Sequence, residues 1–323
     1  MIRQTFTAAA VAALAVTAAP VAAETQLRTA FFTTDAGSLF YEGMDAFVQE
    51  LNRVGEGELR IPAILGPDAV PEGQLGQALR NGIIDIAGAP PSYFNSFVPG
   101  AEVMSAAVVG PAEMRSTGAF DIMNEAFQQR ANIYLLAVFG EGMNFHIYTN
   151  RAVDSLADFE GMRLRTSPTY RAFFDTIGVQ AVQTGRGEVY TAMERGVVDG
   201  YGNMNSEMLA WREVTRYRVD PGFMNAVVVV GVNLDTWNGL SDAQRDILRQ
   251  MAEFIEEEVS PQMAERNIAL GEEMVAAGDL EIITLPEPDA TTYYEAALRG
   301  TWDTAQGNAP ELIGQLRPLI GID

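Results

Sequence analysis

Apolar and polar residues follow one another along this chain in two patterns, one typical of buried strands and the other typical of amphipathic helices. Residues 27–34 form an apolar run of strand length, and apolar side chains then recur at helical spacing from Phe40 to Leu51. A second strand pattern covers residues 58–65. The order strand, helix, strand predicts a parallel α/β architecture.

The later part of the chain continues these patterns. Further strands are expected at 132–139, 143–149, 162–166 and 179–184, and a helix is expected at 170–177. Ser241 and Gln244 form a capping-box pattern, and apolar positions at helical spacing follow it to about residue 277. We therefore expect a long helix in the C-terminal third of the chain, with a kink near Pro261.

One short pattern occurs twice. The sequence A-L-R-N-G-I-I-D-I at 78–86 is matched by A-M-E-R-G-V-V-D-G at 192–200, about 114 positions later. Each copy predicts a helix that ends at a glycine, as a left-handed C-cap requires, followed by a short strand that carries an aspartate. Two copies at this separation indicate two lobes that are built alike.

The repeat defines an expected two-lobed α/β fold with a ligand cleft between the lobes and a long C-terminal helix. Ligands of open α/β sheets bind at the carboxyl ends of strands, so the segments after the two repeated strands should face each other. We assign residues 24–142 and 229–270 to the first lobe and residues 143–228 and 271–323 to the second. The chain is expected to cross between the lobes near Met143 and Val228.

The N-terminus has the layout of a cleavable secretory signal. A basic residue at Arg3 precedes an apolar stretch at 8–18 and small residues at 21–23. The apolar stretch is shorter than the roughly 20 residues that a spanning helix needs. We predict cleavage near Ala23 and a soluble mature protein in the periplasm.

Composition narrows the range of functions. The 323 residues include 43 acidic side chains and 21 basic ones, all of them arginine, for a formal net charge of -22. Such a charge opposes binding to nucleic acid or to an anionic membrane surface. An anionic ligand would therefore need positive charge supplied locally by its site.

Several kinds of catalysis lack the necessary residues. The chain has no cysteine, and His146 is its only histidine, so thiolate chemistry, cysteine metal sites and two-histidine metal sites are excluded. With a single histidine, the chain has almost no residues from which to build a Ser-His-Asp triad. We predict no cofactor and no metal. Catalysis by paired carboxylates stays open, although no pair is singled out by its spacing.

Several spaced blocks resemble the solute-binding proteins of TRAP transporters, the DctP-like family. They are N-R-A-V at 150–153, L-A-D-F-E-G-M-R-L-R at 156–165, G-E-V-Y-T-A at 187–192, G-V-V-D-G at 196–200 and N-L-D-T-W at 233–237. The resemblance covers most of the mature chain. It implies a periplasmic-binding-protein-like fold that closes on a ligand and passes it to a membrane permease.

The resemblance also implies site residues. Arg165 corresponds to the arginine that grips the ligand carboxylate in this family, and a guanidinium fork matches a carboxylate bidentately and stays charged in a desolvated cleft. Asn203 corresponds to an asparagine that contacts the ligand. Each has an alternative role, a surface ion pair for Arg165 and a turn for Asn203. Ser167 and Met204 are the further predicted ligand-binding residues beside these two.

Two departures from the family pattern affect specificity. Gly142 is followed by Met143 rather than by the additional arginine of many carboxylate-binding relatives. Arg186 occupies a position that is often apolar or aromatic in those relatives, and it either adds a second cation to the cleft or pairs with Glu188 or Glu194. The ligands of the better-known members therefore cannot be assigned to this chain.

Tyr93 and Phe145 are the aromatic residues that we expect in the cleft walls, although core packing also explains each of them. The function expected from these observations is a monomeric, non-enzymatic receptor. It would bind a small organic carboxylate and deliver it to TRAP permease subunits. A secreted hydrolase that uses two carboxylates and a sensory ligand-binding module are the alternatives. The ligand itself is left open among C4 acids, keto acids, aromatic acids and sulfonates.

Overall fold

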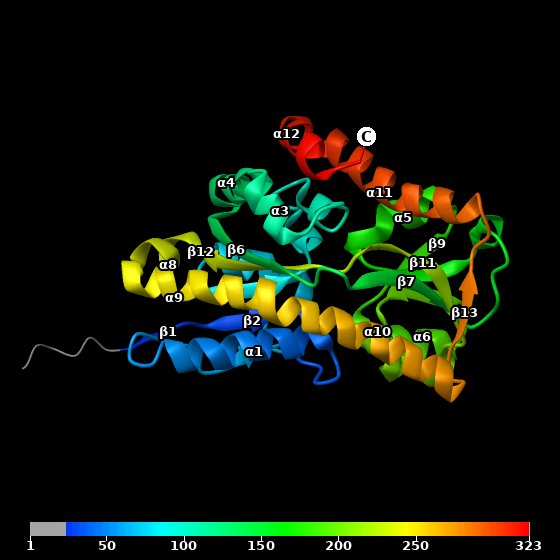
Figure 1. Cartoon of the computed structure of the whole chain (residues 1–323), viewed down its shortest axis with the longest axis horizontal. Helices are drawn as coiled ribbons and strands as arrows, with labels where there is room; N and C mark the ends of the chain where they lie inside the picture. The colour runs from blue at the N-terminus through cyan, green and yellow to red at the C-terminus, as the bar shows by residue number, and fades with distance from the viewer. Residues whose placement is uncertain (1–23, 323) are drawn as a thin grey trace, which may run out of the picture.

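The computed structural model describes residues 24–322, and the predicted signal at 1–23 lies outside them. Two sheets lie side by side, each covered by helices, and one long helix runs along both (Figure 1). Among the described residues, no helix has the length and apolar character needed to cross a bilayer. The mixed α/β, two-lobed architecture expected from the sequence is confirmed.

The first lobe contains a sheet with the strand order β4-β2-β5-β12-β6. Its strands are β2 (Thr29–Phe31), β4 (Ile64–Leu65), β5 (Ile86–Ala89), β6 (Ile133–Phe139) and β12 (Val228–Asn233). The helices around it are α1 (Leu39–Val54), α2 (Leu75–Arg80), α3 (Pro111–Ser116), α4 (Ala119–Ala131), α8 (Leu234–Gly239) and α9 (Asp242–Glu253). Short 3-10 turns are η1 (Glu72–Gln74), η2 (Pro91–Phe94) and η3 (Ala101–Met104). β12 is antiparallel to both of its neighbours, and β2 is parallel to β4 and β5.

The second lobe contains a sheet with the strand order β13-β11-β7-β10-β8-β9. Its strands are β7 (Asn144–Thr149), β8 (Arg163–Thr166), β9 (Gln180–Gln183), β10 (Gly200–Asn203), β11 (Tyr217–Asn225) and β13 (Glu281–Thr284). Its helices are α5 (Arg171–Thr176), α6 (Val189–Glu194) and α7 (Asn205–Met208). The 3-10 turns are η4 (Leu156–Phe159), η5 (Pro168–Tyr170), η6 (Arg186–Glu188) and η7 (Leu209–Val214).

One strand expectation differs from the structure. The single strand expected at 58–65 is two short strands in different sheets, because β3 (Leu59–Arg60) pairs with β1 (Thr25–Gln26) whereas β4 pairs with β2. An apolar run predicts burial, but it does not show where the backbone changes its pairing partner.

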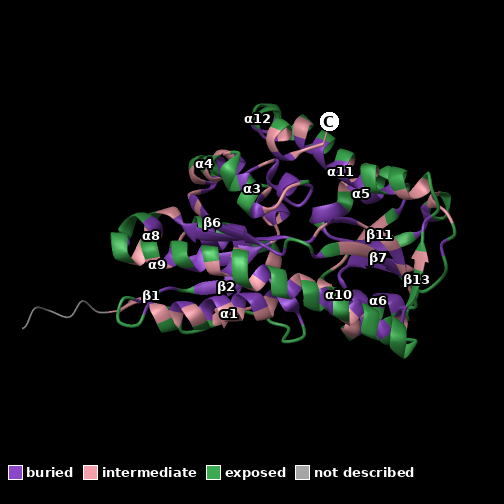
Figure 2. Cartoon of the chain, in the orientation of Figure 1, coloured by how far each residue is buried: buried purple, intermediate pink, exposed green. Residues whose placement is uncertain are grey.

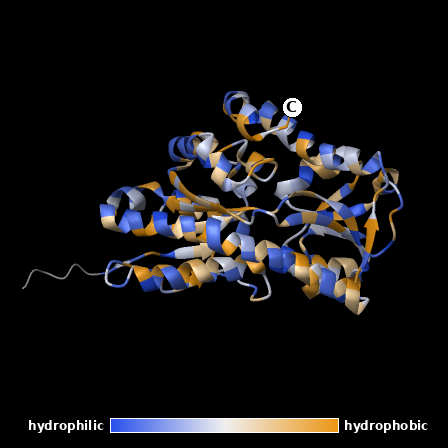
Figure 3. Cartoon of the chain, viewed as in Figure 1, coloured by the Kyte–Doolittle hydropathy of each residue, from blue (hydrophilic) through white to orange (hydrophobic). Residues whose placement is uncertain are grey.

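The helical pattern expected from Phe40 to Leu51 is confirmed. In α1 the buried face includes the residues whose spacing predicted it, from Phe40 through Met44 and Phe47 to Leu51. The strands β2, β5, β6 and β12 of the first sheet are buried and mainly hydrophobic, whereas the edge strands β9 and β13 of the second are partly exposed. The helices expose polar faces to solvent (Figures 2 and 3). Periodicity therefore located the core side of this helix correctly.

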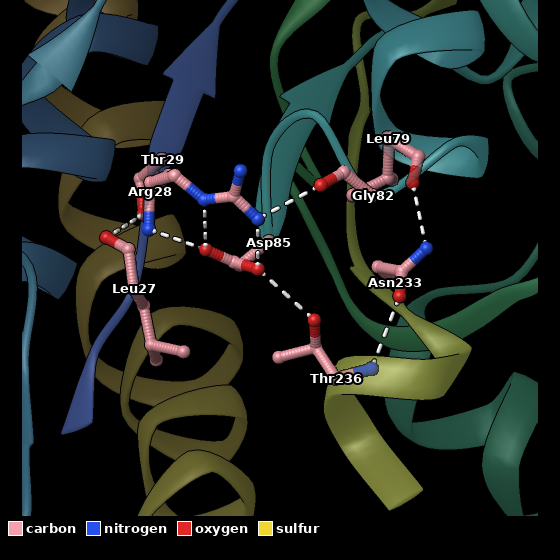
Figure 4. Close-up of polar contacts among 8 residues, drawn as sticks. All are labelled: Leu27, Arg28, Thr29, Leu79, Gly82, Asp85, Asn233 and Thr236. Atoms are coloured by element: carbon pink, nitrogen blue, oxygen red, sulfur yellow. Dashed lines mark hydrogen bonds and ion pairs between the residues drawn. The ribbon is translucent and has the colours of Figure 1, made fainter. Parts of the chain in front are cut away.

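The repeated helix-glycine-strand units have the same hydrogen bonds in both lobes. Gly82 and Gly196 have φ angles of 67° and 65°, in the left-handed region that favours glycine. The Asp85 carboxylate accepts hydrogen bonds from the Arg28 backbone N–H and guanidinium, each at 2.8 Å (Figure 4). The Asp199 carboxylate accepts the corresponding bonds from Arg163 at 3.2 and 3.0 Å.

The surroundings of this unit explain why an aspartate recurs in it. In the first lobe Asp85 also accepts from Thr236 at 3.0 Å, while Asn233 caps α8 and donates to the Leu79 carbonyl (Figure 4). The aspartate thereby joins the strand after each glycine to the neighbouring strand, through an arginine directly before β2 or at the first position of β8. The two lobes share this building unit.

Among residues 24–277, three stretches of chain connect the lobes. β6 leads into β7, β11 leads into β12, and the helix formed by α9, the π-helical segment η8 (Phe254–Val259) and α10 (Ser260–Ala277) runs across both lobes (Figure 1). The predicted capping box at Ser241 is present. The interruption of this helix is the π segment directly before Ser260.

The C-terminal helices also contact both lobes. α11 (Asp289–Asn308) packs against α5 and β11 of the second lobe, and α12 (Pro310–Ile320) packs against α4 of the first. The Trp302 indole of α11 donates to the Ala106 carbonyl at 2.9 Å. The division at 24–142 with 229–270 and 143–228 with 271–323 stays a prediction.

Candidate functional site

Six of the seven predicted site residues line one inner cavity between the lobes. They are Tyr93, Phe145, Arg165, Ser167, Arg186 and Asn203. The inner cavity measures about 50 Å³, and a neighbouring outer cavity of about 450 Å³ shares Tyr93, Arg165 and Ser167 with it. Together they reach the size of roughly 300–1,000 Å³ that is typical of small-molecule sites.

Arg165 lies near the end of β8 and is 7% exposed. Its Nε donates to the Thr184 carbonyl at 3.2 Å, and its Nη1 donates to the Tyr170 hydroxyl at 3.1 Å. Within residues 24–322, no carboxylate lies within 4.0 Å of this guanidinium. Arg165 is therefore a buried cation whose protein partners are neutral, and it can accept an anion.

Tyr170 holds this arginine in place. Its hydroxyl accepts from Arg165 and donates to the Gly202 carbonyl of β10 at 2.6 Å. A Cβ at Gly202 would lie 2.8 Å from the Tyr170 ring, so the absence of a side chain there allows the ring to approach. No sequence pattern indicates that the Tyr170 hydroxyl orients Arg165.

Asn203 is the last residue of β10 and is 6% exposed. Its Oδ1 accepts from the Met204 backbone N–H at 3.0 Å. Within the described part of the chain its Nδ2 donates no hydrogen bond, so this group can donate to a ligand. The turn role and the ligand role that the sequence left open are compatible, because different atoms serve them.

Met204 does not line either cavity. Its side chain is completely buried in the hydrophobic core, where the chain turns from β10 into α7. Ser167 does line both cavities, at the start of η5. Proximity in sequence to Asn203 thus did not bring Met204 to the cleft surface, because adjacent residues at a strand end point in different directions.

Arg186 lines the inner cavity but is already paired. It forms ion pairs with Glu207 of α7 and, at 3.5 Å, with Asp35 of the first lobe. These carboxylates replace the Glu188 and Glu194 partners considered from the sequence. Burial lowers the pKa of Arg186, and Asp35 opposes that shift. Arg186 therefore contributes less free positive charge than Arg165 does.

Aromatic side chains from both lobes form the cavity walls. The ring centroids of Tyr93 and Phe32 lie 6.4 Å apart, and those of Phe145 and Tyr170 lie 5.3 Å apart. Phe40 adds to the first-lobe side. Phe32 and Phe40 were not predicted as site residues, because their sequence pattern is also that of core positions.

Two polar contacts join the lobes across the cleft. The hydroxyls of Ser92 and Thr169 lie 3.0 Å apart and are hydrogen bonded, and Arg186 reaches Asp35 as described above. Both contacts lie beside the cavities that Arg165 lines. The described state is therefore one in which the lobes are closed on each other at this edge.

The two repeat units differ where the cavity begins. Arg165 comes two residues after Arg163, and the equivalent position after Arg28 is Ala30. Asn203 comes four residues after Asp199, and the equivalent position after Asp85 is Ala89. At these two positions the same scaffold thus presents an arginine and an asparagine in the second lobe and alanines in the first.

Another cavity, of about 460 Å³, lies between α10 and the second sheet. Its cation, Arg218, is engaged by Asp220 through two bonds of 2.9 Å. Asn205 and Asn267 also line it, and the Asn205 side-chain amide donates a hydrogen bond of 2.8 Å to the Asn267 backbone carbonyl. Because these groups satisfy one another, the cavity with the unpaired Arg165 is the better candidate for a ligand site.

No metal site accompanies the candidate residues. Between residues 24 and 322, no three histidine, aspartate or glutamate side chains converge in a way that could hold a metal ion. The chemistry available at the cleft is that of two guanidinium groups, an amide, hydroxyls, aromatic rings and the carboxylates of Glu72 and Glu188. These groups suit the binding of a small ligand with an anionic group.

Comparisons with known proteins identify the family to which this chain belongs. Residues 32–306 match the family described as bacterial extracellular solute-binding protein, family 7, or DctP. A solute-binding protein of Chromohalobacter salexigens is 26% identical over 294 residues, which cover 84% of this chain and 82% of that protein. The ectoine/5-hydroxyectoine-binding periplasmic protein UehA of Ruegeria pomeroyi is 23% identical over 313 residues, which cover 91% of this chain and 89% of UehA.

A solved structure shows the same fold. A TRAP periplasmic solute binding protein from Desulfovibrio salexigens, with bound orotic acid, has a TM-score of 0.78 and 19% sequence identity to this chain. The match covers 91% of this chain and 97% of that one. The chain therefore belongs to bacterial extracellular solute-binding protein family 7, the DctP family of TRAP-transporter solute-binding proteins that its sequence blocks indicate.

Proposed function

We propose that this protein captures a small organic carboxylate between its lobes, with Arg165 as the anion anchor, and delivers it to the membrane subunits of a TRAP transporter. The observation that carries the proposal is the buried guanidinium of Arg165, which has neutral protein partners. Bonds between such a group and a carboxylate are about twice as strong as neutral hydrogen bonds.

The other cleft residues have supporting roles in this proposal. Asn203 donates from Nδ2 to a second polar atom of the ligand, and Ser167 offers a hydroxyl beside Arg165. Tyr93 and Phe145 exclude water from opposite walls. Water exclusion strengthens the ion pair with Arg165, because Coulomb attraction grows as the local dielectric constant falls.

Opening of the lobes admits the ligand in this proposal, since the inner cavity of about 50 Å³ is smaller than usual ligand sites. The motion takes place where β6 passes into β7 and β11 passes into β12. Those connections lie side by side, with the Ala226 N–H bonded to the Met143 carbonyl at 2.7 Å. The π segment η8 contacts β6 before this connection, because the Glu256 carboxylate accepts a hydrogen bond from the Val138 N–H at 2.8 Å.

The setting of the protein forms part of the proposal. We place it in the periplasm, as a monomer that releases its ligand chemically unchanged. The ligand-binding family supports a receptor rather than the secreted hydrolase considered from the sequence. A sensory partner in place of a permease would use the same cleft, and a pull-down with the TRAP membrane subunits distinguishes the two.

A thermal-shift screen tests the function. A panel of ectoine, orotate, pyroglutamate, succinate and pyruvate is added to the protein, because a ligand that binds only the folded state raises Tm. We expect at least one member to raise Tm by several degrees and to be recovered unchanged by mass spectrometry after incubation. Conversion of that compound to a product would contradict the receptor role.

A further inference from the structure

We infer that the cleft contains a second, cation-accepting subsite at Glu72, so that the ligand is a small zwitterion with one carboxylate and one positively charged group. The inference rests on the proposed function, since it assigns the other end of the ligand that Arg165 holds. It follows from the placement and the partners of Glu72.

Glu72 lies in η1 of the first lobe and lines both the inner and the outer cavity. Its Oε2 accepts a hydrogen bond from the Tyr93 hydroxyl at 3.0 Å. Within residues 24–322, no arginine nitrogen and no imidazole nitrogen lies within 4.0 Å of its carboxylate. The charge of Glu72 acts on Arg186 at longer range. Because its one hydrogen-bond donor is the neutral Tyr93 hydroxyl, the carboxylate retains capacity for a cation.

Glu72 and Arg165 face the same space from opposite lobes. Both line the two cavities, and both act on the Tyr93 hydroxyl between them. Burial raises the pKa of Tyr93 first, the charge of Glu72 raises it further, and the charge of Arg165 acts in the opposite direction. One molecule of modest size can therefore meet Arg165 at one end and Glu72 at the other.

The charge balance at the cleft favours a zwitterion over a simple anion. Arg186 is neutralised by Glu207 and Asp35. Counting these three together with Arg165, Glu72 and Glu188, which lines the outer cavity, two cations face four carboxylates, a formal excess of two negative charges. A dianion would add charge of the same sign beside Glu72, whereas a ligand ammonium or amidinium offsets it.

The walls suit the cationic end as well. Phe32 and Tyr93 lie on the side of the cavity to which Glu72 belongs, and Phe145 and Tyr170 close the opposite side. Aromatic faces attract cations through the ring quadrupole, most strongly where water is excluded. A compact ring with a delocalised cation would use these faces and the Glu72 carboxylate together.

The experiment compares two ring carboxylates that differ at the cationic group. Ectoine is a cyclic amidinium carboxylate, whereas pyroglutamate has a five-membered lactam ring and carries only the negative charge. Calorimetry measures Kd for both with the unaltered full chain, with Glu72→Gln and with Glu56→Gln, at one fixed salt concentration. Glutamine keeps an oxygen that can accept the Tyr93 hydrogen bond, and Glu56 is an exposed residue of the same lobe outside the cleft.

We expect the unaltered protein to bind ectoine at least tenfold more tightly than pyroglutamate. Glu72→Gln should weaken ectoine binding at least tenfold and change pyroglutamate binding less than threefold, and Glu56→Gln should change neither. Equal losses for both ligands, or an unchanged Kd for ectoine, would overturn the cation subsite. Kd is also measured for L-proline and proline betaine, two further zwitterions with a carboxylate and a cationic ring nitrogen.

Failure of the inference is distinguishable from failure of the proposed function. If no zwitterion of the series binds but pyroglutamate or orotate does, the Glu72 subsite is refuted while the carboxylate receptor stands. If an anion binds and Arg165→Met leaves its Kd unchanged, the anchor assignment is refuted instead. If neither zwitterions nor anions bind, both are refuted.

Discussion

Replacement of Tyr170 by phenylalanine tests how the anion anchor is positioned. The hydroxyl joins Arg165 Nη1, at 3.1 Å, to the Gly202 carbonyl, at 2.6 Å, while the ring packs on Gly202. Phenylalanine keeps the ring and removes only these two bonds. The guanidinium then retains its bond to the Thr184 carbonyl at 3.2 Å and gains freedom to leave the cleft.

The size of the effect follows from these bonds. A buried acceptor left without its donor costs about 1–3 kcal/mol, so we expect Tyr170→Phe to lower the free energy of unfolding by about 2 kcal/mol. Reorienting Arg165 should cost about 1 kcal/mol on ligand binding, which raises Kd about fivefold. Calorimetry with the tightest acid of the panel measures Kd, and thermal unfolding measures stability.

A matched control separates positioning from general destabilisation. Tyr201 is also fully buried in the second lobe, and its hydroxyl is bonded to Thr215 Oγ1 at 2.7 Å, but it does not line the cleft cavities. Tyr201→Phe should lower Tm comparably and leave Kd unchanged. An unchanged Kd in Tyr170→Phe, or an equal rise in both variants, would refute the positioning role.

Two further substitutions test the connection between the lobes and the loss of stability at low pH. Gly140 and Gly57 both have positive φ angles, but a Cβ at Gly140 would lie 2.4 Å from a backbone oxygen, whereas one at Gly57 would touch nothing. Gly140→Ala should therefore lower Tm by several degrees more than Gly57→Ala. Equal losses of Tm in thermal unfolding would contradict this. Burial opposes ionisation of Asp220, but hydrogen bonds from His146 and Arg218 outweigh it and hold the pKa of Asp220 at about 2. Because this pKa lies below the unfolded value of about 3.9, its stabilisation of about 1–2 kcal/mol is present above pH 4 and is lost as pH falls toward 2. Asp220→Asn should therefore flatten the decline of unfolding free energy between pH 4 and pH 2 in urea titrations, and an unchanged slope would contradict the assignment.

The sequence predicted the scaffold well, because periodicity and glycine signals depend on local physics. The amphipathic face of α1 and the capping box at Ser241 were both expected, and both are present. The glycine of each repeat adopts the left-handed conformation that a C-cap requires. Arg165 could be selected because its sequence block is distinctive.

The parts that could not be predicted depend on contacts between distant segments. Glu72 lies in a short turn with no motif, and only the approach of the lobes places it opposite Arg165. The partners of Arg186 come from Asp35 and Glu207, whereas the sequence suggested nearer carboxylates. Sequence spacing shows which residues share an element, but not which elements meet across a cleft.

The most direct test of the central claim compares two arginines of the same strand. Arg165→Met and Arg163→Met each remove one charge and keep an extended side chain, but Arg163 is paired with Asp199 outside the cleft. Calorimetry with the acid that raises Tm most should show a loss of at least about 30-fold for Arg165→Met, since removing one partner of a buried charge pair costs about 2–5 kcal/mol. The Kd of Arg163→Met should stay within threefold of the unaltered value. Near-normal affinity in Arg165→Met, or an equal loss in Arg163→Met, would contradict the account.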